Sequence, residues 1–325
     1  MPEVELSCGL APSPDFESLV VLAERLGYHR VWIYDSAPLW EDPFVHLALA
    51  ARRTTCIGLA TAVLIPDQRS EMAMASAIAT VARMSQGRFR ACFGTGFTSR
   101  LTMGRRPMTL AQLGRYVTAV RGLLAGETVD LDGAPARMLH ADGLTAPRPV
   151  EVPLWLSAFG PRGAAVAADV ADGIVGQPHP SLPTATIVSG TVLGKDESKT
   201  ASRVRDAIGP WRMVDWHNAY ATHGAEGVGA LPGGRNWREE LESLAPEGER
   251  YLLTFESHVT HLLPRDRLLL DHIDTSRMVG TAERLDGRLE RLGGYGFHEV
   301  VYTPTGPDIP RELEAFAEAG HRHLA

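Results

Sequence analysis

Short apolar runs alternate with amphipathic segments along most of the chain. The apolar runs are nearly continuous in hydrophobic residues, which is typical of strands buried on both faces of a parallel sheet. Glycine and proline interrupt the pattern where an element is expected to begin or end. The pattern predicts eight strands, which are Val4–Leu10, Arg30–Tyr34, Cys56–Leu64, Arg88–Phe93, Val152–Ser157, Gly173–Gly176, Arg250–Glu256 and Glu299–Thr303.

Most of these strands are followed by a segment with apolar residues at helical spacing. Eight such strands in one domain favour an α/β fold that closes into a (β/α)8 TIM-like barrel, and a doubly wound open sheet is the alternative. Residues 177–249 are the least regular part and are too long for a plain loop. We therefore expect a single domain over residues 1–325, with a helical insertion near 177–249 that covers the barrel mouth. The main predicted helices are Asp15–Leu26, Asp42–Arg53, Ser70–Met84, Thr109–Leu124, Thr281–Leu292 and Ile309–Ala319.

Composition narrows the class of protein. Hydrophobic residues make up 44% of the chain and charged residues 22%, which is ordinary for a globular protein. The net charge is −7 and the basic residues are scattered, so we expect neither nucleic acid nor a membrane as a partner. No apolar stretch approaches the ~18 residues of a membrane span, and no secretion signal is expected at the N-terminus. We expect a cytoplasmic homodimer that acts on a small molecule.

The carboxyl ends of the strands are where a barrel of this kind places its active site. The residues predicted at those ends include one Asp, Asp35, and one Glu, Glu256, but no Lys. They form no cluster of metal-ligating side chains, so no metal is expected, and they contain no nucleophilic serine elbow. A site so poor in catalytic side chains suggests that a cofactor supplies the chemistry.

One turn has a composition that suggests a phosphate-binding site. Ser157, Ala158, Phe159 and Gly160 follow an apolar strand, and a helix of small residues begins after them. Arg162 would lie in the first turn of that helix, where a cation opposes the helix dipole by roughly 0.3–1 kcal/mol unless an anion binds there. Free backbone N–H groups and a cation together describe a phosphate site. An ordinary turn with a solvated arginine is the other interpretation.

Four segments, residues 30–66, 75–97, 156–175 and 280–306, resemble the bacterial luciferase-like oxidoreductases. That superfamily includes FMN-dependent monooxygenases and enzymes that use the deazaflavin coenzyme F420. The resemblance extends over nearly the whole chain and is weakest in 177–249. It implies a TIM-like barrel that holds a flavin or deazaflavin at the carboxyl ends of its strands.

The resemblance also implies roles for particular residues at that end of the barrel. By similarity, Ser157, Ala158, Phe159, Gly160 and Arg162 would bind the cofactor phosphate. Thr61, Ala62 and Val63 match a strand with a non-prolyl cis peptide behind the tricyclic ring, here expected between Ala62 and Val63. Gly94, Thr95 and Gly96 match the loop beside the ring, and Ser36 is expected to contact the cofactor as well.

Asp35 and Trp40 match an Asp-x4-Trp arrangement in the deazaflavin-dependent sugar-phosphate dehydrogenases, and this resemblance makes both of them candidate catalytic residues. Those enzymes have His directly after the Asp, where this chain has Ser36, and an acid in the Gly-Thr-Gly loop, where it has Phe97. Both departures argue against sugar-phosphate oxidation. Without a role in the site, Asp35 would cap the next segment and Trp40 would pack under a loop.

His258 follows the predicted strand Arg250–Glu256, so it is expected to face the site. It is a candidate proton donor or hydrogen-bond partner of the substrate, and a purely structural histidine is the alternative.

The favoured function is a coenzyme F420-dependent reductase or dehydrogenase that transfers a hydride to or from a small organic substrate. The first alternative is a monooxygenase in which reduced FMN reacts with O2. The second is a paralogue that binds a flavin without catalysis. The pattern of residues does not identify the substrate.

Overall fold

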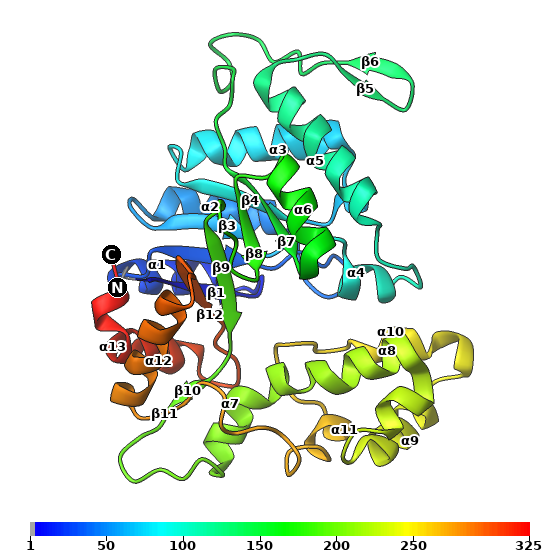
Figure 1. The fold of residues 1–325 in the computed structure, drawn as a ribbon, viewed down its shortest axis with the longest axis vertical. Coiled ribbons are helices and arrows are strands. Elements are labelled where there is room, and N and C mark those ends of the chain that lie inside the picture. Colours follow the sequence, from blue (N-terminus) through cyan, green and yellow to red (C-terminus); the bar gives the residue numbers. More distant parts are fainter. Residues whose placement is uncertain (1–3) are drawn as a thin grey trace.

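Eight parallel strands form a closed barrel in the computed structural model, which describes residues 4–325 (Figure 1). This confirms the predicted fold class. The first and last barrel strands pair with each other, so the sheet has no free edge. In order around the barrel the strands are β1 (Glu5–Leu10), β2 (Arg30–Ile33), β3 (Gly58–Thr61), β4 (Phe89–Phe93), β7 (Leu154–Ala158), β8 (Gly173–Gly176), β9 (Thr184–Val188) and β12 (Glu299–Tyr302).

A ring of helices covers the outside of this barrel and buries the main hydrophobic core against it. Capping residues fix several of their starting points, as where the Asp42 side chain accepts a 2.8 Å hydrogen bond from the Phe44 N–H ahead of Pro43. The barrel interior holds a second cluster that includes Trp32 and Trp155. The ring helices are α1 (Phe16–Arg25), α2 (Pro43–Arg53), α3 (Glu71–Met84), α5 (Leu110–Ala125), α6 (Gly160–Val170), α12 (Ala282–Gly294) and α13 (Ile309–Ala319).

The prediction of a seventh strand at Arg250–Glu256 was wrong. Residues Arg250–Glu256 do not join the barrel, because Arg250–Thr254 form helix α10, and the seventh barrel strand is β9. Periodicity alone cannot assign a short apolar run such as 250–256 to strand or helix. The true strand was missed because β8 and β9 are joined by the loop 177–183, where a helical connection was expected.

The helical insertion is present, but its bounds are residues 193–278 and not 177–249. It leaves the barrel after β10 (Thr191–Val192) and returns at β11 (Val279–Gly280), and these two short strands pair. Its own hydrophobic core is built around Trp216, Trp237 and Leu269. Its elements are α7 (Ser202–Arg212), α8 (Val214–Gly229), α9 (Gly234–Leu244), η2 (Glu247–Glu249), α10 and α11 (Pro264–Arg267).

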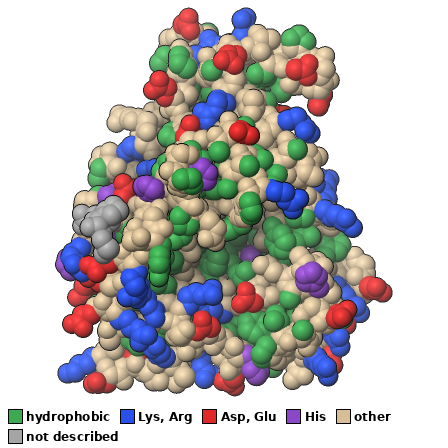
Figure 2. Space-filling model, viewed as in Figure 1, with side chains coloured by type: hydrophobic (Ala, Val, Ile, Leu, Met, Phe, Trp, Pro, Cys, Tyr) green, Lys and Arg blue, Asp and Glu red, His purple; other side chains and the backbone are tan. Residues whose placement is uncertain are grey.

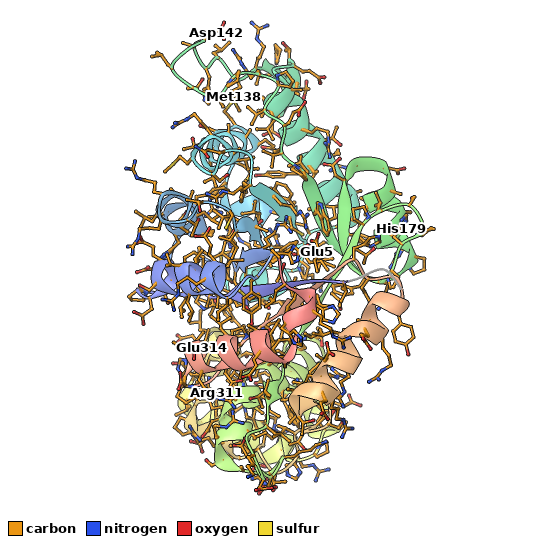
Figure 3. The ribbon with its side chains drawn as sticks, turned by 90° about the vertical axis from the view of Figure 1, so that its left-hand side faces the viewer. Glu5, Met138, Asp142, His179, Arg311 and Glu314 are labelled. Atoms are coloured by element: carbon orange, nitrogen blue, oxygen red, sulfur yellow. The ribbon has the colours of Figure 1, made fainter. Side chains whose placement is uncertain are left out.

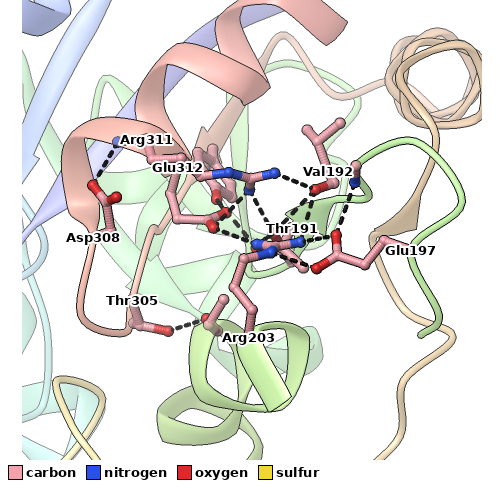
Figure 4. Close-up of polar contacts among 12 residues, drawn as sticks. Thr191, Val192, Glu197, Arg203, Thr305, Asp308, Arg311 and Glu312 are labelled. Carbon is pink, nitrogen blue, oxygen red and sulfur yellow. Dashed lines mark hydrogen bonds and ion pairs between the residues drawn. The ribbon is translucent and has the colours of Figure 1, made fainter. Parts of the chain in front are cut away.

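A polar cluster fixes the insertion to the barrel where it begins (Figure 4). Arg203 of α7 donates to the Thr191 hydroxyl and to the Glu312 carboxylate of α13, both at 2.9 Å. Arg311 binds the same carboxylate at 2.7 Å and the Val192 carbonyl at 2.8 Å. These contacts hold the first helix of the insertion against the last helix of the barrel.

The remaining elements lie around the rim and at the far end. The hairpin β5 (Val129–Leu131) and β6 (Ala134–Ala136) lies at the end of the molecule opposite the insertion (Figure 1). Met138 and Asp142, just beyond it, mark the same end in Figure 3. The short elements η1 (Pro66–Gln68), α4 (Phe97–Leu101) and η3 (His321–His323) complete the chain. Among residues 4–325, no helix has the length and apolar character needed to span a bilayer.

Candidate active site

A cavity of about 500 Å³ opens at the carboxyl end of the barrel, between the strand ends and the insertion. Figure 2 shows a recess with hydrophobic side chains around it between these two parts of the molecule. The structure brings most of the predicted site residues together on its wall. They are Asp35, Ser36, Trp40, Ala62, Val63, Gly94, Thr95, Gly96, Ser157, Phe159 and His258.

Four of the predicted residues do not line this cavity. The Thr61 hydroxyl accepts from the Cys92 N–H at 2.9 Å and donates to the Cys92 carbonyl at 3.1 Å, so it ties β3 to β4. Ala158 at the end of β7, and Gly160 and Arg162 in the first turn of α6, also lie outside the wall. The predicted contacts of Thr61 with the cofactor and of Ala158, Gly160 and Arg162 with its phosphate remain predictions.

Asp35 lies directly after β2 and is almost completely buried. One oxygen, Oδ2, accepts from Arg69 at 2.9 Å and from the Ile65 N–H at 3.3 Å. The other oxygen, Oδ1, is buried and finds no hydrogen-bond partner in the described part of the chain. Burial raises the pKa of Asp35 above its ordinary value, although Arg69 opposes this. The residue therefore presents an unsatisfied oxygen beside the cavity.

The turn after Asp35 adds a second polar group and an aromatic wall. The Ser36 carbonyl accepts from the N–H groups of Leu39 at 2.7 Å and Trp40 at 2.9 Å. This turn brings the Trp40 ring to 5.4 Å from the Tyr34 ring, measured between centroids. The Ser36 hydroxyl oxygen is buried, and no group in residues 4–325 bonds to it.

The segments after β3 and β4 form the adjoining part of the cavity wall. The peptide bond between Ala62 and Val63 is cis, as predicted. A Cβ atom added to Gly94 would lie 2.5 Å from the Val63 Cγ2 atom, and one added to Gly96 would lie 2.7 Å from Ile65 Cγ2. Gly96 also has a φ of +77°, which favours glycine. The two glycines therefore allow the loop after β4 to pack closely on the segment after β3.

The start of α6 has the features expected of a phosphate site. No side chain caps this helix, and Pro161 lies in its first turn. Arg162 is exposed, and nothing in the described chain forms a hydrogen bond or ion pair with it. The backbone N–H groups of this turn and the cation are thus available to an anion.

His258 reaches the cavity from an element other than the one predicted. It lies in a series of turns after α10, inside the insertion, and not at the end of a barrel strand. Burial and the neighbouring His217 hold the pKa of His258 well below its usual range. The ring is neutral at physiological pH as a result.

A second cavity of about 390 Å³ lies beside the first, at the ends of β1 and β12. Four residues, Tyr34, Trp40, His258 and Val259, line both cavities. No lysine or arginine is found among the described residues that line either one. The neighbouring cavities are therefore mainly apolar and lack positive side chains.

Three residues at the site were not among the predicted ones. Trp211 and Asn218 line the first cavity from the insertion, and Arg69 pairs with Asp35 behind the wall without lining it. The Asn218 Oδ1 atom is buried and unpaired within residues 4–325. Residues in the insertion carry no motif, so only a structure could place them.

The cavity is suited to a molecule that is mainly apolar and has polar atoms at its edge. Its walls are mostly apolar, as most small-molecule and cofactor sites are. Around them lie the unpartnered oxygens of Asp35, Ser36 and Asn218, which a bound molecule can satisfy. A phosphate on such a molecule can reach the cation at the start of α6 only if it extends beyond the cavity wall.

Known proteins give an independent comparison. A family model described as luciferase-like monooxygenase matches residues 9–188. The chain is 33% identical over 171 residues to 5,10-methylenetetrahydromethanopterin reductase of Methanolobus tindarius, a match that spans 49% of each chain. It therefore covers about half the length of that relative.

Two further comparisons extend over nearly the full length. The chain is 27% identical over 328 residues to F420-dependent glucose-6-phosphate dehydrogenase of Beutenbergia cavernae, covering 94% of this chain and 91% of that protein. A solved structure of an F420-dependent secondary alcohol dehydrogenase in complex with an F420-acetone adduct aligns with a TM-score of 0.69 at 16% identity over 100% of both chains. This last likeness shows a shared fold.

Proposed function

The chain belongs to the luciferase-like monooxygenase family of oxidoreductases, and on that premise we propose that it transfers a hydride between coenzyme F420 and a small, uncharged organic molecule. One observation carries the proposal. Asp35 and Ser36 place two buried, unpartnered oxygens on the wall of an apolar cavity at the carboxyl end of the barrel. The relatives from Methanolobus and Beutenbergia are a reductase and a dehydrogenase, which supports the reaction class, and the Beutenbergia protein is named as F420-dependent, which supports the cofactor.

The cofactor would be held from two sides. Asp35 and Ser36 would satisfy its polar edge, and Ala62, Val63 and the glycines after β4 would contact its ring. The N-terminus of α6 and Arg162 would bind its phosphate. When bound, a deazaflavin supplies a carrier for one hydride and does not readily activate O2. The chain itself must therefore exclude water from the cavity and handle the proton that accompanies the hydride.

The substrate is proposed to be neutral because of what the cavities lack. Binding of a substrate phosphate relies on arginine, lysine or a helix N-terminus. Neither cavity has a cationic side chain among its described lining residues, and the cation at α6 is assigned to the cofactor. A sugar phosphate, the substrate named for the Beutenbergia relative, would find no matching charge. A small alcohol or ketone fits these walls better.

A monooxygenase that uses reduced FMN is the second candidate, because the family model that matches this chain is described as luciferase-like monooxygenase. The two candidates differ in their need for oxygen. Purified protein should be titrated separately with coenzyme F420 and with FMN, followed by fluorescence. Turnover of a panel of small alcohols and ketones should then be measured without oxygen.

We expect coenzyme F420 to bind more tightly than FMN and to support turnover under anaerobic conditions. Tighter binding of FMN, with turnover that needs O2, would establish the monooxygenase instead. Arg52→Ala serves as a control for changes in surface charge, because Arg52 is exposed on the outer helix α2.

A further inference from the structure

A row of three buried polar side chains leads from the cavity wall into the insertion. The Nδ1 atom of His258 lies 3.0 Å from the Nδ1 atom of His217. The Nε2 atom of His217 lies 3.5 Å from Oδ1 of Asp266, which is at the long end for a hydrogen bond. His217 and Asp266 have side-chain exposures of 2% and 1%, so this row is sealed from solvent behind His258.

The far end of the row is held firmly. Trp237 Nε1 donates to Asp266 Oδ1 at 2.9 Å, and the Leu263 N–H donates to Oδ2 at 3.0 Å. Burial raises the pKa of Asp266, but the hydrogen bonds and charge of His217, together with these donors, lower it overall. Asp266 therefore stays ionised, and its carboxylate is an acceptor only.

Other groups around the two histidines are aromatic. Phe255 lies edge-on to His258 with ring centroids 5.1 Å apart, and Trp237 lies 5.6 Å from His217. Burial and His217 lower the pKa of His258, and the charge of Asp266 opposes them.

The backbone around His258 is held in an unusual conformation. Ser257 has a φ of +61° and Val259 a φ of +53°. Positive φ is rare for a β-branched residue such as valine and is unfavourable. Such backbone persists where the surroundings over-determine it, and it is found at functional sites more than elsewhere. The turn fixes the His258 ring between His217 and the two cavities.

The hydrogen-bond geometry limits where protons can be when the pair is neutral. Because Asp266 can only accept, the Nε2 atom of His217 carries hydrogen. The Nδ1 atom of His217 is then an acceptor, so the Nδ1 atom of His258 must be the donor in the contact between the rings. The Nε2 atom of His258 is left with a free lone pair.

One added proton reverses this arrangement. His217 becomes an imidazolium beside Asp266 and donates from Nδ1 to the Nδ1 atom of His258. His258 must then carry its own hydrogen on Nε2. The pair therefore changes the His258 Nε2 atom from an acceptor to a donor while the positive charge rests on His217, next to the carboxylate.

From this geometry we infer that His258 is the catalytic residue that exchanges a proton with the substrate oxygen at Nε2, and that His217 and Asp266 are positioning residues that take up the charge. The role in turnover rests on the proposed function. In oxidation of an alcohol, the C–H bond breaks with its electron pair as a hydride to the oxidised deazaflavin, and the O–H proton goes to Nε2. The C=O bond forms, the Nδ1 proton of His258 moves to His217, and reduction follows the reverse path.

The proton positions can be tested without a substrate or cofactor. Heteronuclear NMR of the histidine ring nitrogens reports which nitrogen carries hydrogen. The midpoint is the pH at which half of the histidine pairs carry the added proton. Above this pH, we expect hydrogen on Nδ1 of His258 and on Nε2 of His217. As the pH falls, His217 should become doubly protonated in the same step in which the hydrogen of His258 moves to Nε2. We call the coupled proton transfer between the substrate, His258 and His217 the relay. Independent titration of the two rings, or hydrogen on Nε2 of His258 at high pH, would overturn it.

Variants separate the relay from a structural role. Asp266→Asn removes a negative charge that favours the protonated pair, so the midpoint should fall by about one pH unit or more. His223→Gln is the matched control, because His223 is exposed on the same helix α8 as His217. The control should leave both ring assignments and the midpoint unchanged. An unshifted midpoint in Asp266→Asn would overturn the role of this carboxylate, and the wild-type spectra decide the relay if a variant fails to fold.

A kinetic measurement connects the relay to turnover. With any substrate found in the anaerobic panel, Asp266→Asn should lower kcat more than it changes KM and shift the pH profile by the same amount as the NMR midpoint. A fall in kcat with an unshifted profile would contradict the relay. Failure of coenzyme F420 to bind would refute the proposed function but would leave the proton positions measured by NMR unaffected, so the two failures are distinguishable.

Discussion

The two ends of the barrel each contain a buried carboxylate, but its surroundings differ. At the amino end, Glu299 binds Arg30 at 3.1 Å and Arg90 at 2.7 Å, and also accepts from Ser7 at 2.6 Å and Trp32 at 2.7 Å. At the carboxyl end, Asp35 has one oxygen paired and the other unpartnered in the described structure.

The cations differ in the same way. At the amino end, Arg90 both binds Glu299 and stacks over the Trp155 ring, with its guanidinium carbon 4.0 Å from the centroid. At the carboxyl end, Arg162 is exposed and has no anion among residues 4–325. The contrast lies in the carboxylates, because the Nε atoms of Arg30 and Arg90 also find no partner within residues 4–325. A carboxylate with both oxygens paired stabilises the fold, whereas one with an unpaired oxygen can accept a hydrogen bond from a molecule that the chain does not supply.

The comparison is tested most severely at Glu299. Replacing Glu299 by Gln removes the buried charge and leaves the half-buried Arg30 and Arg90 without this carboxylate partner. We expect the free energy of unfolding to fall by about 3–5 kcal/mol, as when one partner of a buried ion pair is lost. Denaturant unfolding measures this.

Glu5→Gln is the control, because Glu5 lies opposite Glu299 in the strand register but is exposed. A loss of less than about 1 kcal/mol in Glu299→Gln, the range of surface ion pairs, would show that the amino-end cluster is not structural.

A matched pair of serines compares the two ends directly. Ser7→Ala removes a donor to a charged group and should lower the free energy of unfolding by about 1.5–3 kcal/mol. Ser36→Ala removes a buried hydroxyl without a partner in the described chain, and should raise it by about 1 kcal/mol. Coenzyme binding should weaken in Ser36→Ala alone. Equal destabilisation by both variants would remove the distinction between the ends.

The sequence allowed much of this architecture to be predicted, because the barrel strands are buried on both faces and therefore read as apolar runs. The failure came where that signal was ambiguous. Residues 250–256 are apolar enough for a strand, but they pack as α10 within the insertion, while β9 follows β8 without the expected helix.

The site residues also differ in how well the sequence predicts them. Residues at strand ends, such as Asp35 and Ser36, could be placed from topology and resemblance. His258 was assigned to the site from a strand that does not exist, and its contact with His217 depends on how the insertion folds. Such contacts join residues far apart in sequence, and no spacing along the chain encodes them.

Substitution of Arg162 tests whether this unpaired cation binds the coenzyme phosphate. Arg162→Ala should weaken coenzyme binding by about 1–3 kcal/mol, the range for a hydrogen bond to a charged group. Stability should change little, because nothing in the described chain depends on this side chain. Titration of the variant beside Arg52→Ala measures the difference, and equal affinities for the two variants would remove the phosphate assignment.

The pH dependence of stability gives the finest test, because the two carboxyls should contribute with opposite sign. Burial raises the pKa of Asp35 in the folded protein, so this group binds its proton more tightly when folded. Its stabilising contribution is therefore greatest below the unfolded pKa of about 3.9 and is lost as the pH rises through the folded pKa. Burial also raises the pKa of Glu299, but Arg30 and Arg90 lower it overall. Its contribution is therefore present above about 4.3 and is lost as the pH falls through the folded pKa.

The two opposite pH dependences can be measured by comparing the free energy of unfolding of wild type with that of each variant at several acidic pH values. The difference between wild type and Asp35→Asn should become less favourable to wild type as the pH rises. The difference between wild type and Glu299→Gln should become more favourable over the same range. Each variant removes one titrating carboxyl, so every other group cancels in the subtraction. Slopes of the same sign would mean that Asp35 is stabilised as an anion by Arg69 as fully as Glu299 is by its two arginines. The open oxygen at the carboxyl end would then have no energetic consequence in the absence of a bound molecule.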